Sequence, residues 1–151
     1  MSNKKIVLAS DHAGFSLKEE LRRYLEDKGY LLEDYGAFAS EPVDYPDYAL
    51  KAARAVAARK FQLGILICGT GIGMAIVANK IPGIRAACCQ DCFSARAARE
   101  HNDANILTLG ARVIGPGLAM MVVENFLEAS FQGGRHQRRL EKISSIEKCS
   151  G

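Results

Sequence analysis

Short apolar runs alternate with amphipathic stretches along almost the whole chain, and this alternation constrains the fold more than any other feature. Strands that alternate with helices form a parallel sheet that helices cover on both faces. We therefore predict a single α/β domain over residues 1–151, with a three-layer α/β/α, Rossmann-like fold around a five-stranded parallel sheet. The expected strands are residues 6–10, 30–35, 63–67, 84–89 and 106–109. The expected helices are residues 15–28, 48–59, 72–79, 93–101, 115–131 and 137–148.

The composition is that of an ordinary globular protein, with 151 residues, 48% hydrophobic and 25% charged, and a formal net charge of +3. So small a charge gives no reason to expect a nucleic-acid partner. No apolar run approaches the roughly 20 residues of a membrane-spanning helix, and the run 6–9 suits a first strand rather than a signal peptide. The five cysteines are an odd number, which argues against a full set of disulfides. We expect a cytoplasmic protein with reduced thiols and no nucleic-acid or membrane partner.

A glycine-rich segment, Cys68-Gly69-Thr70-Gly71-Ile72-Gly73, directly follows the apolar run 61–67. This order predicts a buried strand, a glycine turn and a helix, so Cys68 would lie at the carboxyl edge of the sheet, where α/β proteins bind ligands. Glycines let backbone N–H groups converge on an anion, and the start of the helix adds its positive end. A thiol beside an anion site suits removal of a proton from carbon while an oxyanion develops next to it.

The glycine segment also fits two other interpretations. A glycine turn is common packing geometry between a strand and a helix. It could also bind a dinucleotide, because Asp91 follows about twenty residues later, after another strand. Against nucleotide binding, the third fingerprint position is Met74 rather than glycine, and the loop follows the third strand rather than the first.

Polar residues follow a strand and a helix at two further places. Asp11 and His12 come after the first expected strand, so they face the same crevice as Cys68 if strands 1 and 3 are neighbours. Asp11 could instead cap the next helix, whereas His12 suits a phosphate or a sugar hydroxyl. His101-Asn102-Asp103 ends a helix, where a histidine can simply favour the negative helix end and an asparagine can cap it.

The most concentrated basic segment covers residues 135–139. It fits a solvated helical face, a nucleic-acid patch or a phosphate site. No aromatic residue is interleaved to stack on bases, and arginine forks match phosphate oxygens. Leu140, Ile143 and Ile146 form a separate apolar stripe, suited to the core or to a subunit contact.

Cys88, Cys89 and Cys92 include the C-x-x-C spacing of redox motifs at a strand-to-helix junction. A zinc site would need a second pair, which Cys68 and Cys149 do not form. Small apolar cysteines in the core are the favoured interpretation.

Eight segments then bear on a known family. They are Ser10-Asp11-His12-Ala13-Gly14, Asp44-Tyr45-Pro46, residues 65–73, Asn79-Lys80, Gly83-Ile84-Arg85-Ala86, His101-Asn102-Asp103, Gly110-Ala111-Arg112-Val113 and Gly133-Gly134-Arg135-His136. Together they resemble ribose-5-phosphate isomerase type B, in a family that also contains galactose-6-phosphate and allose-6-phosphate isomerases. The segments fall in the family's order and span nearly the whole chain, which is far more specific than one glycine loop.

The resemblance implies interconversion of ribose 5-phosphate and ribulose 5-phosphate through an enediolate, without a metal or organic cofactor. It implies that Cys68 moves the proton between C2 and C1, and that His101 opens the furanose ring. The loop residues Gly69, Thr70, Gly71 and Gly73 would stabilise the enediolate oxygen. The other implied contacts are Asp11 and Tyr45 to the sugar, Asn102 to a hydroxyl, and His12, Arg112, Arg135 and Arg139 to the phosphate.

Two alternatives stay open. Within the family, the chain could be a hexose 6-phosphate isomerase, and it departs from the family at Met74, where a serine or similarly small residue is usual. Outside enzymes, it could be a non-catalytic sugar-phosphate or nucleotide binding domain. Such a domain would need the crevice and the arginines but no titrating thiol at position 68.

Strand direction predicts where His101 lies relative to Cys68. Cys68 ends a strand, whereas His101 and Asn102 precede the fifth strand, so the two groups lie at opposite edges of their own sheet. A strand of five residues spans about 17 Å, more than a histidine can bridge. We therefore expect a homodimer, or a dimer of dimers, with active sites shared between chains and the helix 137–148 at a subunit contact.

Overall fold

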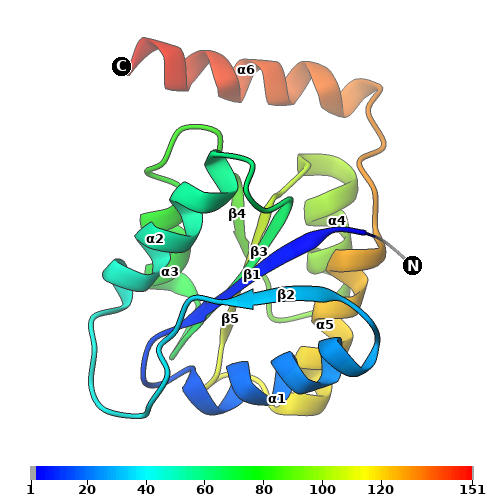
Figure 1. Cartoon of the computed structure of the whole chain (residues 1–151). Coiled ribbons are helices and arrows are strands. Elements are labelled where there is room, and N and C mark those ends of the chain that lie inside the picture. Colours follow the sequence, from blue (N-terminus) through cyan, green and yellow to red (C-terminus); the bar gives the residue numbers. More distant parts are fainter. Residues whose placement is uncertain (1–2, 151) are drawn as a thin grey trace.

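The computed structural model describes residues 3–150, in which strands and helices alternate (Figure 1). The strands are β1 (Lys5–Ser10), β2 (Leu31–Asp34), β3 (Leu63–Cys68), β4 (Ala86–Cys88) and β5 (Ile106–Gly110). The helices are α1 (Phe15–Asp27), α2 (Tyr45–Ala57), α3 (Ile72–Ala78), α4 (Cys92–Asn102), α5 (Pro116–Glu128) and α6 (Arg135–Cys149).

The five strands form one parallel sheet in the order β2-β1-β3-β5-β4. β3 lies at its centre and is buried at every position, as expected of a strand whose two faces are both covered. One hydrophobic cluster packs α1, α4 and α5 on one face of the sheet, and a second packs α2 and α3 on the other (Figure 1). The predicted three-layer fold is confirmed.

The pairing of β1 with β3 decides where the functional loops lie. Ser10 pairs with Ile67, so the segments that follow these two strands leave the sheet next to each other at its carboxyl edge. The next strand, β5, pairs Gly110 with Cys68 at the same edge. Residues that follow three neighbouring strand ends therefore lie side by side at one edge of the sheet, where open α/β sheets bind ligands.

Several bounds differ from the sequence-based expectation, and two of the differences concern α2 and β4. α2 begins at Tyr45 rather than Tyr48, because Pro46 fits the first turn of a helix, where no backbone donor is needed. β4 is shorter than expected, because the N–H of Arg85 donates to Asn105 Oδ1 at 2.8 Å instead of joining the sheet. Tyr45 is consequently carried by a helix and not by a loop.

α6 lies apart from the two helical layers and crosses the amino edge of the sheet (Figure 1). Only His136 and Leu140 of this helix are buried, whereas Ile146 is 66% exposed. The far end of α6 is tied to the domain by Glu147, whose carboxylate accepts the N–H of Gly83 at 3.1 Å. Within residues 3–150, no helix is both long and apolar enough to cross a membrane.

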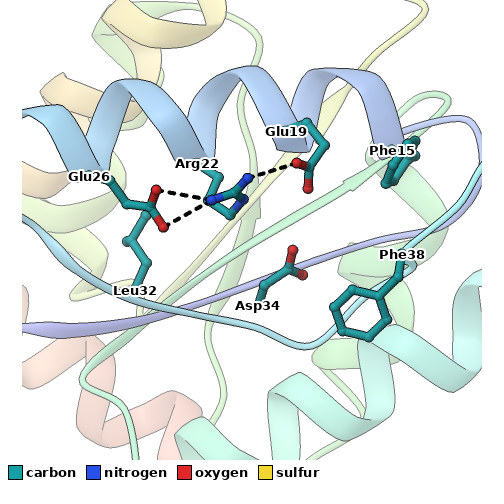
Figure 2. Close-up of a pocket in the computed structure, with 7 residues that line it drawn as sticks. All are labelled: Phe15, Glu19, Arg22, Glu26, Leu32, Asp34 and Phe38. Atoms are coloured by element: carbon teal, nitrogen blue, oxygen red, sulfur yellow. Dashed lines mark hydrogen bonds and ion pairs between the residues drawn. The ribbon is translucent and has the colours of Figure 1, made fainter.

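A hollow of about 440 Å³ lies between α1 and β2 (Figure 2). Its one arginine, Arg22, lies between two glutamates of α1 and donates to both, at 2.9 and 3.0 Å. Asp34, at the end of β2, pairs with the fully buried Lys18 and accepts the N–H of Gly36 at 2.8 Å. These contacts fix the chain where it leaves β2 for the loop that leads to α2.

Candidate active site

Cys68 is the last residue of β3 and is almost fully buried at the carboxyl edge of the sheet. Its Sγ accepts a hydrogen bond from the N–H of Gly71 at 3.1 Å. The donor sits on the sulfur, where a thiolate carries its negative charge. The thiol is thus held against the glycine loop, as the sequence predicted.

The glycine loop turns sharply at Gly71, which has a φ of +80°, in the left-handed region that glycine adopts without cost. α3 begins directly afterwards. In its first turn, the N–H groups of Gly73 and Met74 have no hydrogen-bond partner within residues 3–150. These two donors are therefore available to an oxyanion, whereas the N–H of Gly71 is engaged by the sulfur of Cys68.

Side chains behind the loop fix its shape. Gln90 donates through Nε2 to the carbonyl of Thr70 at 2.8 Å and accepts the N–H of Gly110 at 3.2 Å. Thr108, buried on β5, donates through Oγ1 to the carbonyl of Gly71 at 2.7 Å. The sequence reasoning missed Gln90, because a single glutamine after a strand carries no recognisable signal.

Asp11 and His12 follow β1 and lie beside the loop. Asp11 is buried, and its Oδ1 accepts the N–H of Gly14 at 3.0 Å, so it braces the turn ahead of α1. A Cβ at position 14 would lie 2.3 Å from the carbonyl oxygen of Ile67, so this close approach to β3 requires glycine. His12 Nδ1 lies 3.1 Å from the N–H of Val43, which donates to it and fixes the ring against the loop before α2.

Tyr45 and Arg112 pack against the glycine loop and the start of α3. A Cβ added at Gly73 would lie 2.6 Å from the ring of Tyr45, so that ring packs directly on the backbone of α3. A Cβ at Gly69 would lie 3.4 Å from Nη1 of Arg112, an exposed residue just after β5. The carboxyl edge therefore presents a thiol, a carboxylate, a phenol, an imidazole and a guanidinium around free backbone donors.

A second group of the predicted site residues lies at the amino edge. His101 and Asn102 end α4, while Arg135 and Arg139 lie in the first turns of α6. The rings of His101 and His136 are stacked, with centroids 4.4 Å apart and planes at 11°. Burial, with the nearby charges of His101 and the two arginines, lowers the pKa of His136.

Within one chain, the two groups of site residues are not brought together. β5 runs from Ile106 to Gly110 between them, so they are separated by roughly the 17 Å that a five-residue strand spans. The phosphate contacts implied by the resemblance are split in the same way, with His12 and Arg112 at one edge and Arg135 and Arg139 at the other.

The remaining candidates have structural roles. Asp91 accepts the N–H of Ser94 at 2.7 Å and caps α4, so its carboxylate is used within the fold rather than turned to a ribose. Met74 is fully buried in the hydrophobic cluster beneath α3, so its side chain is not exposed at the carboxyl edge.

The cysteines are all free. Cys89 is buried, and burial, with a smaller contribution from Cys88, raises its pKa to about 11. A thiol so shifted stays protonated at neutral pH and is a poor nucleophile. Within residues 3–150, no three His, Cys, Asp or Glu side chains gather as a metal site would require.

Comparison with known proteins gives this geometry its context. The profile described as Ribose/Galactose Isomerase matches residues 6–143. The chain belongs to this isomerase family. It is 49% identical to "Ribose-5-phosphate isomerase B" of Escherichia coli (strain K12), over 95% of this chain and 97% of that protein.

Solved structures of similar proteins support the assignment of this chain to the isomerase family. The ribose-5-phosphate isomerase B of Clostridium thermocellum superposes with a TM-score of 0.96 at 52% identity, covering 97% of this chain and 99% of the other. That of Mycoplasma genitalium, solved with bound ribulose-5-phosphate, gives a TM-score of 0.91 at 41% identity, covering 95% and 96%. All the site residues of both edges fall inside the matched region 6–143.

Proposed function

We propose that this isomerase interconverts ribose 5-phosphate and ribulose 5-phosphate through an enediolate, with Cys68 as the base. The observation that carries the proposal is the sulfur of Cys68 held 3.1 Å from the N–H of Gly71, next to the two unpaired N–H groups of α3. A binding domain would need the crevice but not a thiol in this position. The relative of Mycoplasma genitalium binds the ketose of this pair, which supports the choice of substrate.

The chemistry follows from these groups. The thiolate of Cys68 takes the proton from C2 of the open-chain aldose, and the electron pair forms the C1–C2 double bond while O1 becomes an oxyanion. The N–H groups of Gly73 and Met74 stabilise that charge without reorganising, an effect worth roughly 3 kcal/mol for each well-placed donor. Cys68 then returns the proton to C1, the hydroxyl proton passes from O2 to O1, and the ketose forms at C2.

Substrate phosphate and ring opening draw on the amino edge. Arginine forks bind phosphate oxygens in two parallel hydrogen bonds, so Arg135 and Arg139 suit the phosphate, with Arg112 and His12 approaching from the other side. His101 suits ring opening, because an imidazole can move a proton between the ring oxygen and the O1 hydroxyl. Thr70, Asp11, Tyr45 and Asn102 complete the contacts to the sugar.

These residues can act together only if two chains combine. The amino edge of one chain would meet the carboxyl edge of its partner, and a two-fold axis would create two such sites. The exposed Ile143 and Ile146 of α6 would be covered in that homodimer, as a helix at a subunit contact requires. The isomerase would act on its small-molecule substrate in the cytoplasm, where its five thiols stay reduced.

The test is a side-by-side assay of Cys68→Ala on ribose 5-phosphate, with Cys89→Ala as the matched control. Cys68→Ala should lower kcat at least about 10²-fold with the fold intact, because it removes the proton acceptor. Cys89→Ala should change kcat little, since that thiol is buried in the hydrophobic cluster on the opposite face of the sheet from the cluster that contains Cys68. Retention of more than a tenth of the wild-type kcat by Cys68→Ala would eliminate the cysteine base.

Alkylation gives a second measurement on the same pair. Iodoacetamide should inactivate the wild type, and ribose 5-phosphate should slow that inactivation, because the sugar covers Cys68. Parallel assays with allose 6-phosphate separate the pentose from the hexose specificity. A higher kcat/KM for the hexose phosphate would reassign the substrate while leaving the base in place.

A further inference from the structure

The amino edge of the sheet contains a cavity that the proposed catalysis does not use. It has a volume of about 600 Å³, within the range of small-ligand sites. Four of its lining side chains are cationic, and they come from four separate parts of the chain: Lys4, Arg59, Arg85 and Arg99. Asp103 is the one carboxylate among the described lining residues.

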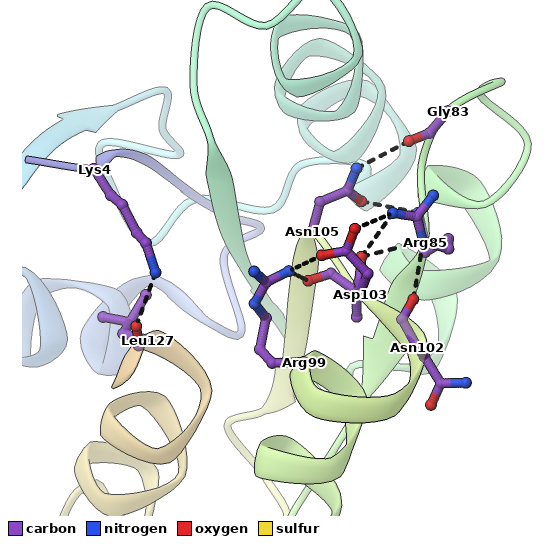
Figure 3. A network of polar contacts seen from close by, with 9 residues as sticks. Lys4, Gly83, Arg85, Arg99, Asn102, Asp103, Asn105 and Leu127 are labelled. Carbon is purple, nitrogen blue, oxygen red and sulfur yellow. Dashed lines mark hydrogen bonds and ion pairs between the residues drawn. The ribbon is translucent and has the colours of Figure 1, made fainter. Parts of the chain in front are cut away.

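The two guanidinium groups at the back of the cavity converge on that carboxylate (Figure 3). Arg99 donates through Nη1 to Oδ1 of Asp103 at 2.9 Å, and Arg85 donates through Nη2 to Oδ2 at 3.1 Å. Within residues 3–150, Nη2 of Arg99 and Nη1 of Arg85 have no hydrogen-bond partner. One terminal nitrogen of each arginine is therefore engaged by the protein, and the other is available to a ligand.

Among the described lining residues, four cationic side chains accompany one carboxylate, so the lining carries more positive than negative charge. Burial, together with the charge of Arg99, lowers the pKa of Lys4, so these two cations repel each other across the site. The hollow beside α1 is the opposite case, since its single arginine faces three carboxylates (Figure 2). Of these two hollows, the amino-edge cavity is the one whose lining favours an anion.

We propose that this cavity is a second anion site, separate from the catalytic residues, which binds a small phosphate monoester through Arg85, Arg99, Lys4 and Arg59. Guanidinium forks match phosphate oxygens, and a dianion would offset the repulsion among the four cations. Asn105 also lines the cavity, and its Nδ2 donates to the carbonyl of Gly83 at 2.9 Å.

The site is joined to the end of α4. Nε of Arg85 donates to the carbonyl of Asn102 at 2.9 Å, and Arg85 and Arg99 both hold Asp103, whose backbone is left-handed with a φ of +45° (Figure 3). An anion that binds the same guanidinium groups acts on the segment that carries His101 and Asn102. Binding of a phosphorylated metabolite in this cavity would therefore affect the position of the amino-edge residues His101 and Asn102.

The experiment uses inorganic phosphate as the probe and follows backbone amide NMR signals of the full chain. Gly83 and Asn105 report on the cavity, and Gly73 reports on the carboxyl edge. We expect saturable shifts of Gly83 and Asn105, with a dissociation constant on the order of millimolar. These shifts should persist in Arg135→Ala/Arg139→Ala, because those arginines do not line the cavity.

Charge-removing variants decide between this site and general attraction. Lys4→Gln/Arg59→Asn should weaken the binding seen at Gly83 at least about tenfold. Arg59→Asn alone should weaken it about threefold, and it suits the backbone there, since Arg59 has a φ of +61° and asparagine tolerates that region. The control Arg23→Gln/Lys51→Gln removes the same charge from exposed positions and should change the affinity less than about twofold.

Two results overturn the proposal. One is the absence of saturable shifts at Gly83 and Asn105 up to tens of millimolar phosphate, on the order of the weakest binding that such a site would show. The other is equal loss of affinity in the cavity variant and in the control, which would reduce the effect to net charge.

Discussion

At the scale of single residues, Gly73 shows how closely the first turn of α3 is packed. The Tyr45 ring rests on this glycine, at a distance that leaves no room for a methyl group. Gly73 has an ordinary helical backbone within α3, so alanine is permitted there by conformation and excluded only by the ring. Function and stability therefore make opposite demands at this position.

Gly73→Ala should lower kcat/KM by about 10²-fold, because the displaced Tyr45 ring moves by a sizeable fraction of an ångström or more relative to the sugar. The melting temperature should stay the same or rise, since alanine is better than glycine in a helix by roughly 1 kcal/mol. Steady-state kinetics and thermal unfolding measure the two effects. In a Tyr45→Ala background, the same substitution should cost little more, and a fully additive loss would contradict the packing explanation.

At the scale of elements, the stack of His101 on His136 joins α4 to α6. His136 is one of only two buried residues of α6, so this contact is a large part of what docks the helix. Its lowered pKa means that the docked helix disfavours a proton on this ring. An undocked α6 would bind that proton at the ordinary histidine pKa of about 6.5.

Docking of α6 should therefore weaken as the pH falls through about 6.5 and be strongest above it. Hydrogen exchange of α6 amides, corrected for the intrinsic rate, should show less protection near pH 5.5 than near pH 7.5. His136→Phe keeps a buried ring on His101 but cannot titrate, so its protection should be nearly independent of pH. His12→Asn, at the other edge, should behave as the wild type, and an unchanged pH dependence in His136→Phe would refute the assignment.

At the scale of the whole molecule, the division of the site residues between two edges predicts complementation between chains. Cys68→Ala and His101→Ala should each be inactive alone. In a mixed dimer, one site would carry both defects and the other neither. Random reassociation of equal amounts should then restore about a quarter of the wild-type activity.

The measurement is the isomerase rate after the two variants are dissociated, mixed and reassociated. Differently tagged chains show that mixed dimers have formed. Tagged mixed dimers without activity would rule out the shared site. The matched control mixes Cys68→Ala with Arg112→Ala, because both substitutions lie at the carboxyl edge. Each site of a mixed dimer would then carry one defect, so no activity should be restored. Restored activity would mean that Arg112 serves the partner's site.

The architecture follows from the sequence where the pattern is strong. The apolar run 61–67 followed by Cys68 and the glycines predicts the central strand, the edge at which the thiol lies and the turn at Gly71. Strand direction alone also places His101 at the other edge. These features depend on local periodicity and chain direction, which a single sequence carries.

Other features depend on contacts between distant segments, and the sequence does not contain them in readable form. Gln90 supports Thr70 across 20 positions, and the ring of His136 meets His101 only because α6 crosses back over the sheet. Tyr45 lies outside the expected helix 48–59, but Pro46 fits the first turn of a helix and brings Tyr45 into α2. Met74 looked like a change to the sugar pocket, but the helix turns it into the core.

The free donors of the first turn of α3 belong to the main chain, and this determines what genetics can reveal about them. Replacing a residue by alanine leaves its N–H in place. An alanine scan would therefore not detect the two N–H groups that we propose as oxyanion donors, and it would attribute their effect to the side chains around them. Proline alone deletes such a donor, and at Gly73 it would also meet the ring of Tyr45. Backbone ester substitution, which exchanges one N–H for an oxygen and keeps every side chain, is the change that would measure what the loop contributes.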